Sequence, residues 1–225
     1  MKKIINILNI KEITIVYGMT ETSPISFQTN IGDDVDLQVS TVGNINPHIE
    51  AKVIDSNKNF ILDRGKPGEL CIKGYSVMKE YWKNKTETKK AIDKDGWMRT
   101  GDLVLMRDDG YLEIVGRIKD TIIKGGENIY PREVEEFLIK IDQIEQAYVF
   151  GVPDKTYGEI VGCWVKLEKN KIISENEIEN KCKNKIASFK IPSFFRIVDE
   201  FPMTASGKVQ KFKMSEEEIA LKINK

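Results

Sequence analysis

The chain has 225 residues, of which 40% are hydrophobic and 31% charged, as in ordinary folded proteins. Its 35 basic and 35 acidic residues give a formal net charge of zero, which argues against a general attraction to nucleic acid or to anionic membranes. The length suffices for one large or two small hydrophobic cores, and no apolar run in the sequence is long enough for a transmembrane segment.

The first residues combine a helix pattern with a strand pattern. Residues 4–16 carry an apolar face at helical spacing that runs into a β-branched strand at Thr14–Tyr17, and this strand ends at Gly18. The basic and apolar opening is similar to a secretory signal, but two asparagines interrupt the apolar stretch and no small-residue cleavage site comes after it. We therefore expect a cytoplasmic protein.

The middle of the chain, from residue 42 to 115, is a series of short alternating strands. The sequence Asp108-Asp109-Gly110 is typical of a hairpin turn between the last two of them. These strands predict a small antiparallel barrel or sheet. Residues 76–92 predict a helical interruption, and we expect Trp82 and Trp97 to pack in the core. The predicted strands have the sequences IEAKVID, GELCIKG, LVLMR and YLEIV.

Residues 116–133 predict a joint between two domains. Gly116-Arg117 closes the last strand, Lys119-Asp120 is a polar pair, and Gly125-Gly126 provides a bend without Cβ atoms. Pro131 suits the first position of the next helix. We expect the order strand, joint, glycine turn, helix.

A compact α+β pattern comes after the joint. Pro131–Ile141 has the apolar spacing of an amphipathic helix, and Ser174 with Glu177 predicts a capping box at the start of a second helix. The charged tail after residue 211 is expected to fray. With a domain boundary at 117–119, the domains are 1–116 and 117–225. Strands are predicted at Ala147–Val152, Ile160–Leu167 and Phe194–Val198.

The cysteines and the single histidine indicate no catalytic or metal site. Cys71, Cys163 and Cys182 are widely spaced and form no C-x-x-C pair, which favours reduced, buried thiols over disulfides or a zinc site. His48 has no nucleophile near it in the sequence, so we expect it to be a loop residue.

Four motifs then occur in one order: YGMTE at Tyr17–Glu21, GWMRTGDL at Gly96–Leu103, GRIKDTIIKGGENIYPRE at Gly116–Glu133, and PMTASGK at Pro202–Lys208. Together they resemble the motifs of the adenylate-forming enzymes, the superfamily of AMP-forming acyl-CoA synthetases, luciferases and peptide-synthetase adenylation domains. The form GGENIYP resembles the fatty acyl-CoA synthetase branch most.

The resemblance implies an α+β fold in two parts. Residues 1–116 would be the barrel-like end of an adenylation domain, and residues 117–225 a small mobile C-terminal domain. The family's glycine- and hydroxyl-rich phosphate loop has no counterpart here. The resemblance therefore implies a C-terminal portion that is inactive alone: a fragment, a misannotated start, or half of a split enzyme whose other half is missing.

The activity implied by the resemblance has two steps. A carboxylic acid, most readily a fatty acid, reacts with ATP to give an acyl-adenylate, and coenzyme A then takes the acyl group and releases AMP. Such a ligase needs Mg²⁺ and positioned charges rather than a covalent enzyme intermediate. The alternative is a non-catalytic remnant or binding module that retains weak adenylate or coenzyme A binding.

The first motif carries three implied roles. Glu21 would be the magnesium ligand, Thr20 would hydrogen-bond the α-phosphate, and Tyr17 would offer its ring to adenine. Gly18 would leave room for the acyl group. The structural alternative is a strand-to-loop turn in which Thr20 and Glu21 merely cap the next segment.

The second motif and the joint would hold the ribose. Asp102 suits two hydroxyls, because an ionised carboxylate accepts a hydrogen bond on each oxygen, and Arg117 resembles the second ribose contact. The alternatives are a turn residue for Asp102 and a surface ion pair with Asp120 for Arg117.

The C-terminal part would supply the mobile groups. Lys208 resembles the lysine that bridges carboxylate and phosphate during adenylation, although a basic patch with Lys211 and Lys213 is the alternative. Lys119 would be the hinge residue near the cofactor. Pantetheine would pass along Lys124, Gly125 and Gly126, where a Gly-Gly turn is the alternative, and Lys190 would meet coenzyme A phosphates.

Overall fold

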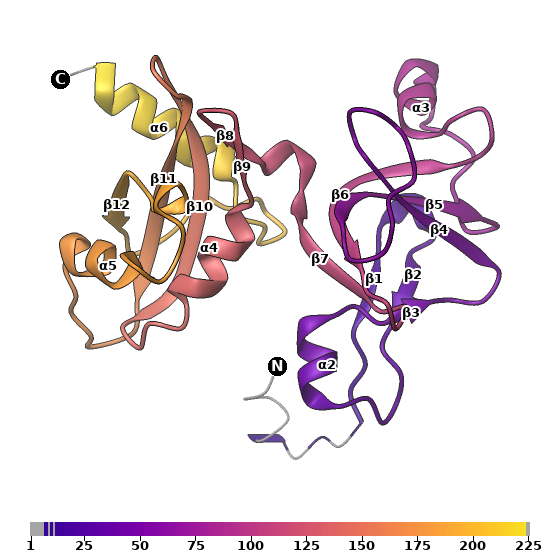
Figure 1. The fold of residues 1–225 in the computed structure, drawn as a ribbon, viewed down its shortest axis with the longest axis horizontal. Helices are drawn as coiled ribbons and strands as arrows, with labels where there is room; N and C mark the ends of the chain where they lie inside the picture. The colour runs from indigo at the N-terminus through magenta and orange to yellow at the C-terminus, as the bar shows by residue number, and fades with distance from the viewer. Residues whose placement is uncertain (1–6, 9, 11, 224–225) are drawn as a thin grey trace. The chain divides into compact units, whose positions relative to one another are not determined.

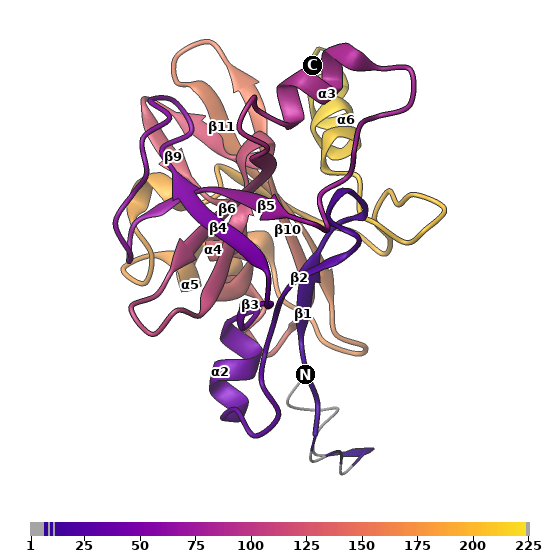
Figure 2. The same cartoon turned by 90° about the vertical axis from the view of Figure 1, so that its right-hand side faces the viewer.

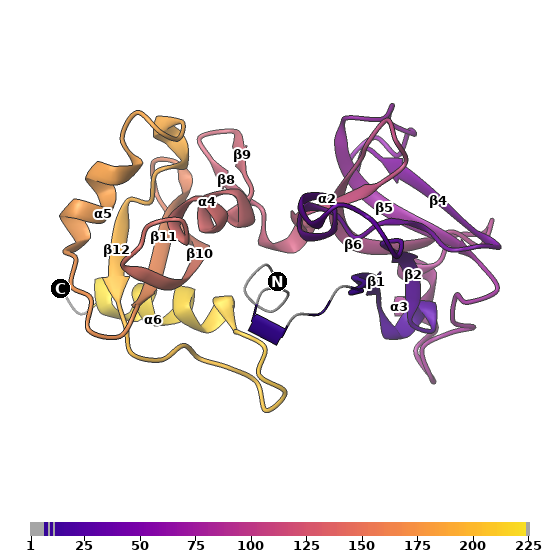
Figure 3. The same ribbon diagram turned by 90° about the horizontal axis from the view of Figure 1, so that it is seen from below.

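A computed structural model of the protein describes residues 7, 8, 10 and 12–223. The chain divides into two compact units, Met1–Ile118 and Lys119–Lys225, which Figures 1, 2 and 3 show from three directions. Each unit combines strands with short helices, which confirms the α+β class. The helix pattern expected in residues 4–16 lies largely outside the described residues.

The first unit begins with a three-stranded antiparallel sheet in the order β1-β2-β3. Its first strand lies two residues later than predicted, and its register shifts between Tyr17 and Gly18. A single 3-10 turn, η1, begins directly after β1, so the YGMTE motif spans the end of a strand and a tight turn. The elements are β1 (Val16–Gly18), η1 (Thr20–Thr22), β2 (Ile25–Gln28), α2 (Val35–Ser40) and β3 (Asn44–Ile45).

Four further strands form an open antiparallel sheet in the order β4-β5-β6-β7, so the described residues form a sheet rather than a closed barrel. The predicted hairpin turn is confirmed: the Arg107 N–H donates to the Tyr111 carbonyl (2.9 Å), and Gly110 has a φ of 86° that favours glycine. The strands are β4 (Ile49–Ile54), β5 (Pro67–Gly74), β6 (Met98–Met106) and β7 (Leu112–Arg117).

The two sheets share a core, but Trp82 is not part of it. Phe27 of β2 is fully buried together with residues of β5, β6 and β7, and Tyr17 packs against this cluster. Trp82 is 82% exposed, so its predicted core position is wrong. The physical reason is local, because Lys83 has a left-handed φ of 53° and α3 (Lys85–Ala91) begins only after it. Trp97 is half-buried, and the Lys52 Nζ lies 4.1 Å from its ring centroid.

The second unit is built on a five-stranded sheet with the path β10-β11-β8-β9, in which β12 pairs with β11 in parallel. The capping box is confirmed, since Ser174 Oγ accepts from the Glu177 N–H (3.3 Å) and Glu177 Oε2 accepts from the Ser174 N–H (2.9 Å). The elements are η2 (Ile118–Asp120), β8 (Ile122–Lys124), β9 (Glu127–Ile129), α4 (Pro131–Leu138), β10 (Ile144–Asp154), β11 (Gly158–Leu167), α5 (Glu175–Cys182), η3 (Ser188–Lys190), β12 (Phe194–Ile197) and α6 (Lys211–Ile223).

Alternate residues of β10 and β11 face two separate cores, as the pleat of a strand requires. One core contains Val149 and Cys163 with the buried residues of α4 and α5. The other contains Phe150 and Trp164 with Met214 of α6. Helices therefore cover both faces of the sheet, α4 and α5 on one side and α6 on the other, as Figure 3 shows.

Helix α6 corrects the expectation that the charged tail frays. Met214 is fully buried, and Ser215 Oγ donates to the Gly151 carbonyl of β10 (2.7 Å). Glu218 is 7% exposed and accepts from the indole N–H of Trp164 (2.8 Å). Because these buried residues recur at helical spacing, they hold the tail on the sheet as a helix despite its high charge.

Candidate functional site

The carboxylate of Asp102 accepts hydrogen bonds from two other residues that were selected from the sequence, Tyr17 and Arg117. Tyr17 Oη donates to Asp102 Oδ2 (2.6 Å), and Arg117 Nε donates to Asp102 Oδ1 (3.1 Å). Asp102 and Arg117 face each other in the register of β6 and β7, whereas Tyr17 comes from β1 in the other sheet of the same unit. Asp102 is 7% exposed, so this carboxylate is almost buried at the point where the two sheets meet.

The surroundings of Tyr17 favour its neutral form. Burial, and then the hydrogen bond to Asp102, raise the pKa of the Tyr17 phenol above its ordinary value of 10. The phenol therefore stays a donor at physiological pH. Because each carboxylate oxygen has two lone pairs, both oxygens of Asp102 retain an acceptor position for a second donor. The cluster can accept hydrogen bonds from a diol such as a ribose.

Arg117 has a buried partner that the sequence alternative did not include. Its Nε pairs with Asp102, and the arginine side chain is 56% exposed while that of Asp102 is 10% exposed. An exposed guanidinium that a buried carboxylate holds from one side lies where a bound group can reach it. Asp102 and Arg117 pair directly across the β6–β7 hairpin, whose turn the sequence predicted.

The turn after β1 fixes the next two candidates. Thr20 is exposed, and Glu21 is half-buried in the same 3-10 turn. Thr22 was not selected from the sequence, yet its Oγ1 accepts from the Met19 N–H (3.2 Å) and is within hydrogen-bond distance of the Met19 and Pro24 carbonyls (3.2 Å each). Thr22 is 1% exposed, so it ties the turn internally while Thr20 faces outward.

The backbone packing around position 18 requires a glycine. A Cβ at this position would lie 1.4 Å from the Pro24 carbonyl oxygen, so no other residue fits the present backbone. On the Cβ side the space is filled by this chain rather than left for a ligand. Any acyl group that passes Gly18 would have to approach from the opposite side.

Glu21 has a partner that the sequence analysis missed. Tyr81 Oη donates to Glu21 Oε1 (3.0 Å), and the Met78 N–H donates to the Glu21 carbonyl (2.8 Å). Among the described residues, no cluster of three or more His, Cys, Asp or Glu side chains could hold a metal. A single carboxylate is compatible with magnesium, because that ion keeps most of its ligands as water and phosphate.

Lys208 lies on an exposed, narrow loop in the second unit, beside the turn at its tip. The Thr204 N–H donates to the Lys208 carbonyl (2.8 Å), and the Lys208 N–H donates to Thr204 Oγ1 (3.1 Å). Gly207 has a φ of 79°, which lets the loop turn back after two residues. The loop presents the Lys208 side chain to solvent on a short, internally bonded support.

Gly125 and Gly126 form the turn of the β8–β9 hairpin. Both have positive φ values, 60° and 89°, as a two-residue hairpin turn requires. A Cβ on Gly126 would meet nothing within 4 Å, so the backbone conformation alone accounts for this glycine. Lys124 Nζ lies 5.9 Å from the ring centroid of Tyr157, and Lys119 lies in η2 at the start of the unit.

Further expectations concern Lys190, the cysteines, His48 and membrane-spanning helices. Lys190 Nζ contacts both carboxylate oxygens of Glu133 (2.6 and 2.7 Å), so its ammonium already has an anionic partner. All three cysteines are free and buried, and His48 lies in a turn with a φ of 63°, as predicted. In the described part of the chain, no helix is long and apolar enough to cross a membrane.

Two family models match the chain. The AMP-binding enzyme model matches residues 1–82, and the AMP-binding enzyme C-terminal domain model matches residues 133–208. Between them they cover the motifs around Tyr17 and Lys208.

Curated relatives carry names of one enzyme class. YngI of Bacillus subtilis (strain 168), an acyl-CoA synthetase by name, is 48% identical over 221 residues, which are 98% of this chain and 40% of YngI. The mitochondrial medium-chain acyl-CoA ligase ACSF2 of Bos taurus is 42% identical over 96% of this chain and 35% of its own length. The chain thus spans less than half the length of these relatives.

Solved structures show the same fold. ATP-bound MatB from Rhodopseudomonas palustris has a TM-score of 0.85 and 34% identity, over 91% of this chain and 40% of MatB. The o-succinylbenzoate CoA synthetase MenE from Bacillus subtilis, in complex with an acyl-adenylate intermediate, has a TM-score of 0.81 and 30% identity, over 90% of this chain and 41% of MenE.

Proposed function

The chain belongs to the AMP-binding enzyme family, and we propose that it forms part of an AMP-forming acid–thiol ligase. In this proposal a carboxylic acid, most readily a fatty acid, is activated with ATP as an acyl-adenylate and then transferred to coenzyme A. The convergence of Tyr17 and Arg117 on the buried carboxylate of Asp102 is the observation that carries the proposal, because it forms a preorganised acceptor for a ribose diol.

The residues of the first unit have complementary tasks in this reaction. Asp102 accepts from the ribose hydroxyls while Tyr17 and Arg117 hold its orientation. Thr20, whose side chain is exposed, donates to the α-phosphate, and Glu21 binds magnesium. When bound, magnesium supplies positive charge that offsets the charge of the phosphates. The single carboxylate of Glu21, held by Tyr81 through one oxygen only, supports this assignment.

The second unit supplies the groups that differ between the two steps. Lys208 neutralises charge between carboxylate and phosphate during adenylation, since its loop leaves the ammonium exposed. Lys124, Gly125 and Gly126 line the path of pantetheine, and Lys119 is the point about which the unit turns. The free, buried state of all three cysteines supports a reducing compartment such as the cytoplasm.

Titration of the chain with AMP, followed through backbone amide NMR shifts, tests the nucleotide site. We expect AMP to shift the amides of Tyr17, Asp102 and Arg117, and Asp102→Asn to weaken AMP binding at least tenfold, about 1.4 kcal/mol. Glu113→Gln is the matched control, because it removes a half-buried ion pair with Arg107 on the same β6–β7 hairpin. Absence of shifts at these residues in millimolar AMP would refute the site.

A further inference from the structure

Glu135 of α4 connects three elements of the second unit through one oxygen. Its Oε1 accepts from the Val149 N–H of β10 (2.8 Å) and from the Lys211 Nζ at the first residue of α6 (2.6 Å). The two side chains are largely withdrawn from solvent, with 17% of Glu135 and 23% of Lys211 exposed. A charge pair at this depth is held more firmly than a surface pair, because solvent competes less for either partner.

Lys211 comes three residues after Lys208, and the loop that carries Lys208 is bonded only to itself. Among the described residues, every hydrogen bond of 204–208 has both its partners inside that loop. The loop closes through a bridge between Met203 and Val209. Since no hydrogen bond from outside holds its tip, the direction of the Lys208 side chain depends on how the base of the loop is anchored.

The base has apolar anchors on both sides, since Val209 packs against the same core as Phe201, and it has one ionic anchor. On the entry side, Phe201 is 7% exposed and packs edge-on against the Tyr148 ring, with centroids 4.7 Å apart. On the exit side, Lys211 is bound by Glu135. The apolar contacts hold the base by packing, and the ion pair adds a charged contact between its exit side and α4.

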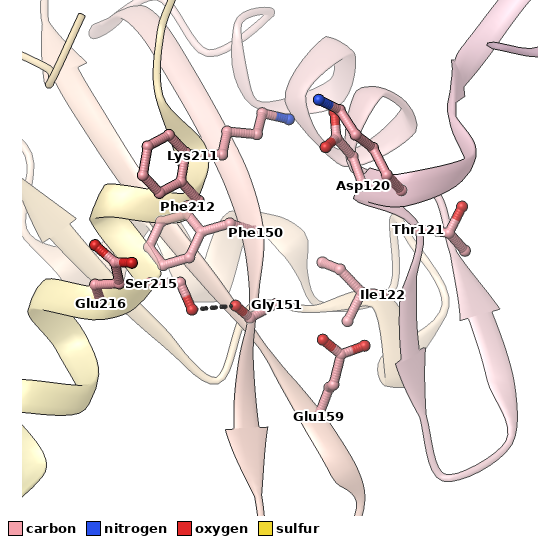
Figure 4. A pocket seen from close by; sticks show the side chains of 11 residues that line it. Asp120, Thr121, Ile122, Phe150, Gly151, Glu159, Lys211, Phe212, Ser215 and Glu216 are labelled. Carbon is pink, nitrogen blue, oxygen red and sulfur yellow. Dashed lines mark hydrogen bonds between the residues drawn. The ribbon is translucent and has the colours of Figure 1, made fainter. Parts of the chain in front are cut away.

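Figure 4 shows Lys211 beside Phe212 at the rim of a cavity of about 280 Å³. The segment that begins with Lys119 and Asp120 also lines this cavity. Lys211 is therefore not enclosed by packing on all sides, and its ammonium is held by the carboxylate of Glu135.

We propose that Glu135 and Lys211 are positioning residues for Lys208. Through the ion pair, α4 and β10 add to the contacts of Met214 and Ser215 that hold the start of α6, and the pair thereby limits the direction of the loop that carries Lys208. This inference rests on the proposed function insofar as Lys208 acts in adenylation. The anchoring of the loop by the ion pair does not depend on it, so the two can fail separately.

The test measures ¹⁵N order parameters of the Thr204, Gly207 and Lys208 amides in the full chain. We expect rigid values of about 0.85 in the wild type and values below about 0.6 in Lys211→Met and Glu135→Gln, with the amides of β10 and β11 unchanged. Lys211→Arg should restore rigidity, because arginine can donate to the same carboxylate. The double variant Glu135→Gln/Lys211→Met leaves no unpaired charge and shows the effect without a charge burial penalty.

Glu136→Gln is the matched control. It removes an ion pair of similar length, Arg132 to Glu136 (2.7 Å), on the same helix, but this pair is exposed and joins two residues of α4 alone. A loop that stays rigid in both Lys211→Met and Glu135→Gln overturns the proposal, and so does a wild-type loop that is already flexible. So too does equal loosening by Glu136→Gln.

Adenylate formation separates this inference from the proposed function. In a preparation that forms adenylate, Lys211→Met and Glu135→Gln should lower the adenylation rate at least tenfold, and Lys211→Arg should recover most of it. Loss of rate without recovery by arginine would contradict a positioning role. If AMP shifts none of the amides of Tyr17, Asp102 and Arg117 while the loop rigidity depends on the ion pair, the proposed function fails and the anchoring stands.

Discussion

Tyr81 and Glu21 are 60 residues apart in the sequence, yet the Tyr81 hydroxyl donates to Glu21 Oε1 at 3.0 Å. The backbone of Tyr81 is itself held, because its N–H donates to Thr88 Oγ1 of α3 (3.0 Å). The Met78 N–H adds a second connection to the Glu21 carbonyl. The segment before α3 therefore fixes both the backbone and the carboxylate of the proposed magnesium ligand.

Tyr81→Phe should lower the affinity of the nucleotide complex for magnesium. Loss of one partly exposed hydrogen bond to a carboxylate costs about 1 kcal/mol, so we expect a magnesium affinity of the nucleotide complex that is lower by roughly fivefold. Calorimetric titration with Mg²⁺ in saturating ATP measures it. Tyr111→Phe is the control, since it removes a similar tyrosine–carboxylate bond to Asp33 (2.8 Å) elsewhere in the same unit. Equal losses in both variants would contradict the prediction.

The raised pKa of Tyr17 predicts an alkaline loss of stability. In the unfolded chain the Tyr17 phenol ionises near pH 10. In the folded protein its pKa is raised, so the phenol stays protonated to a higher pH. Above about pH 10 the unfolded state binds fewer protons than the folded state, so the free energy of unfolding falls as the pH rises. Below it, the contribution of Tyr17 is fully present.

Denaturant unfolding of the wild type and Tyr17→Phe between pH 8 and 11 measures this contribution. We expect Tyr17→Phe to be less stable by about 1 to 2 kcal/mol at pH 8, because Asp102 loses a donor. The difference should shrink as the pH rises above about 10. A difference that stays constant over the range would show that Tyr17 ionises normally.

Glu218 should be essential for the packing of α6. Its Oε1 accepts from Trp164 Nε1 and from Arg196 Nε, both at 2.8 Å, in a nearly buried position. Removing one partner of such a group costs about 3 kcal/mol, whereas an exposed pair contributes less than about 1 kcal/mol. We therefore expect Glu218→Ala to lower the free energy of unfolding far more than Glu217→Ala, whose pair with Arg196 is 54% exposed on the glutamate side.

Equilibrium unfolding in urea provides the comparison. Similar, small effects of the two substitutions would mean that α6 adds little to the stability of the sheet.

Lys119→Pro and Lys208→Ala should damage different half-reactions. Lys119 lies in η2, and proline there fixes its own φ and restricts Ile118, so rotation about this point is hindered. In a preparation that forms adenylate, we expect Lys119→Pro to slow thioester formation while sparing adenylate formation, and Lys208→Ala to do the reverse. Loss of a charge contact in the transition state should lower the rate of the affected step by a factor of at least about one hundred.

Each half-reaction is measured alone, as pyrophosphate release and as acyl transfer from a supplied acyl-adenylate. Parallel losses in both steps for both variants would rule out a second unit that presents two different faces.

Local sequence signals determined most of the elements. The Ser174–Glu177 capping box, the Asp108–Gly110 turn and the Pro131 helix start each act within a few residues, and all three are present in the structure. The same holds for β10 and β11, whose alternating apolar residues face two cores. Family motifs, rather than periodicity, selected the candidate site residues.

Only the tertiary structure decided which of those residues meet. Tyr17 reaches Asp102 because two sheets pack together, and Glu21 meets Tyr81 because a loop folds back over a turn. The final helix was misjudged because spacing and charge describe a segment, but burial depends on which other segments the fold places beside it. Contacts between distant residues arise from packing, and a single sequence without its fold carries no record of them.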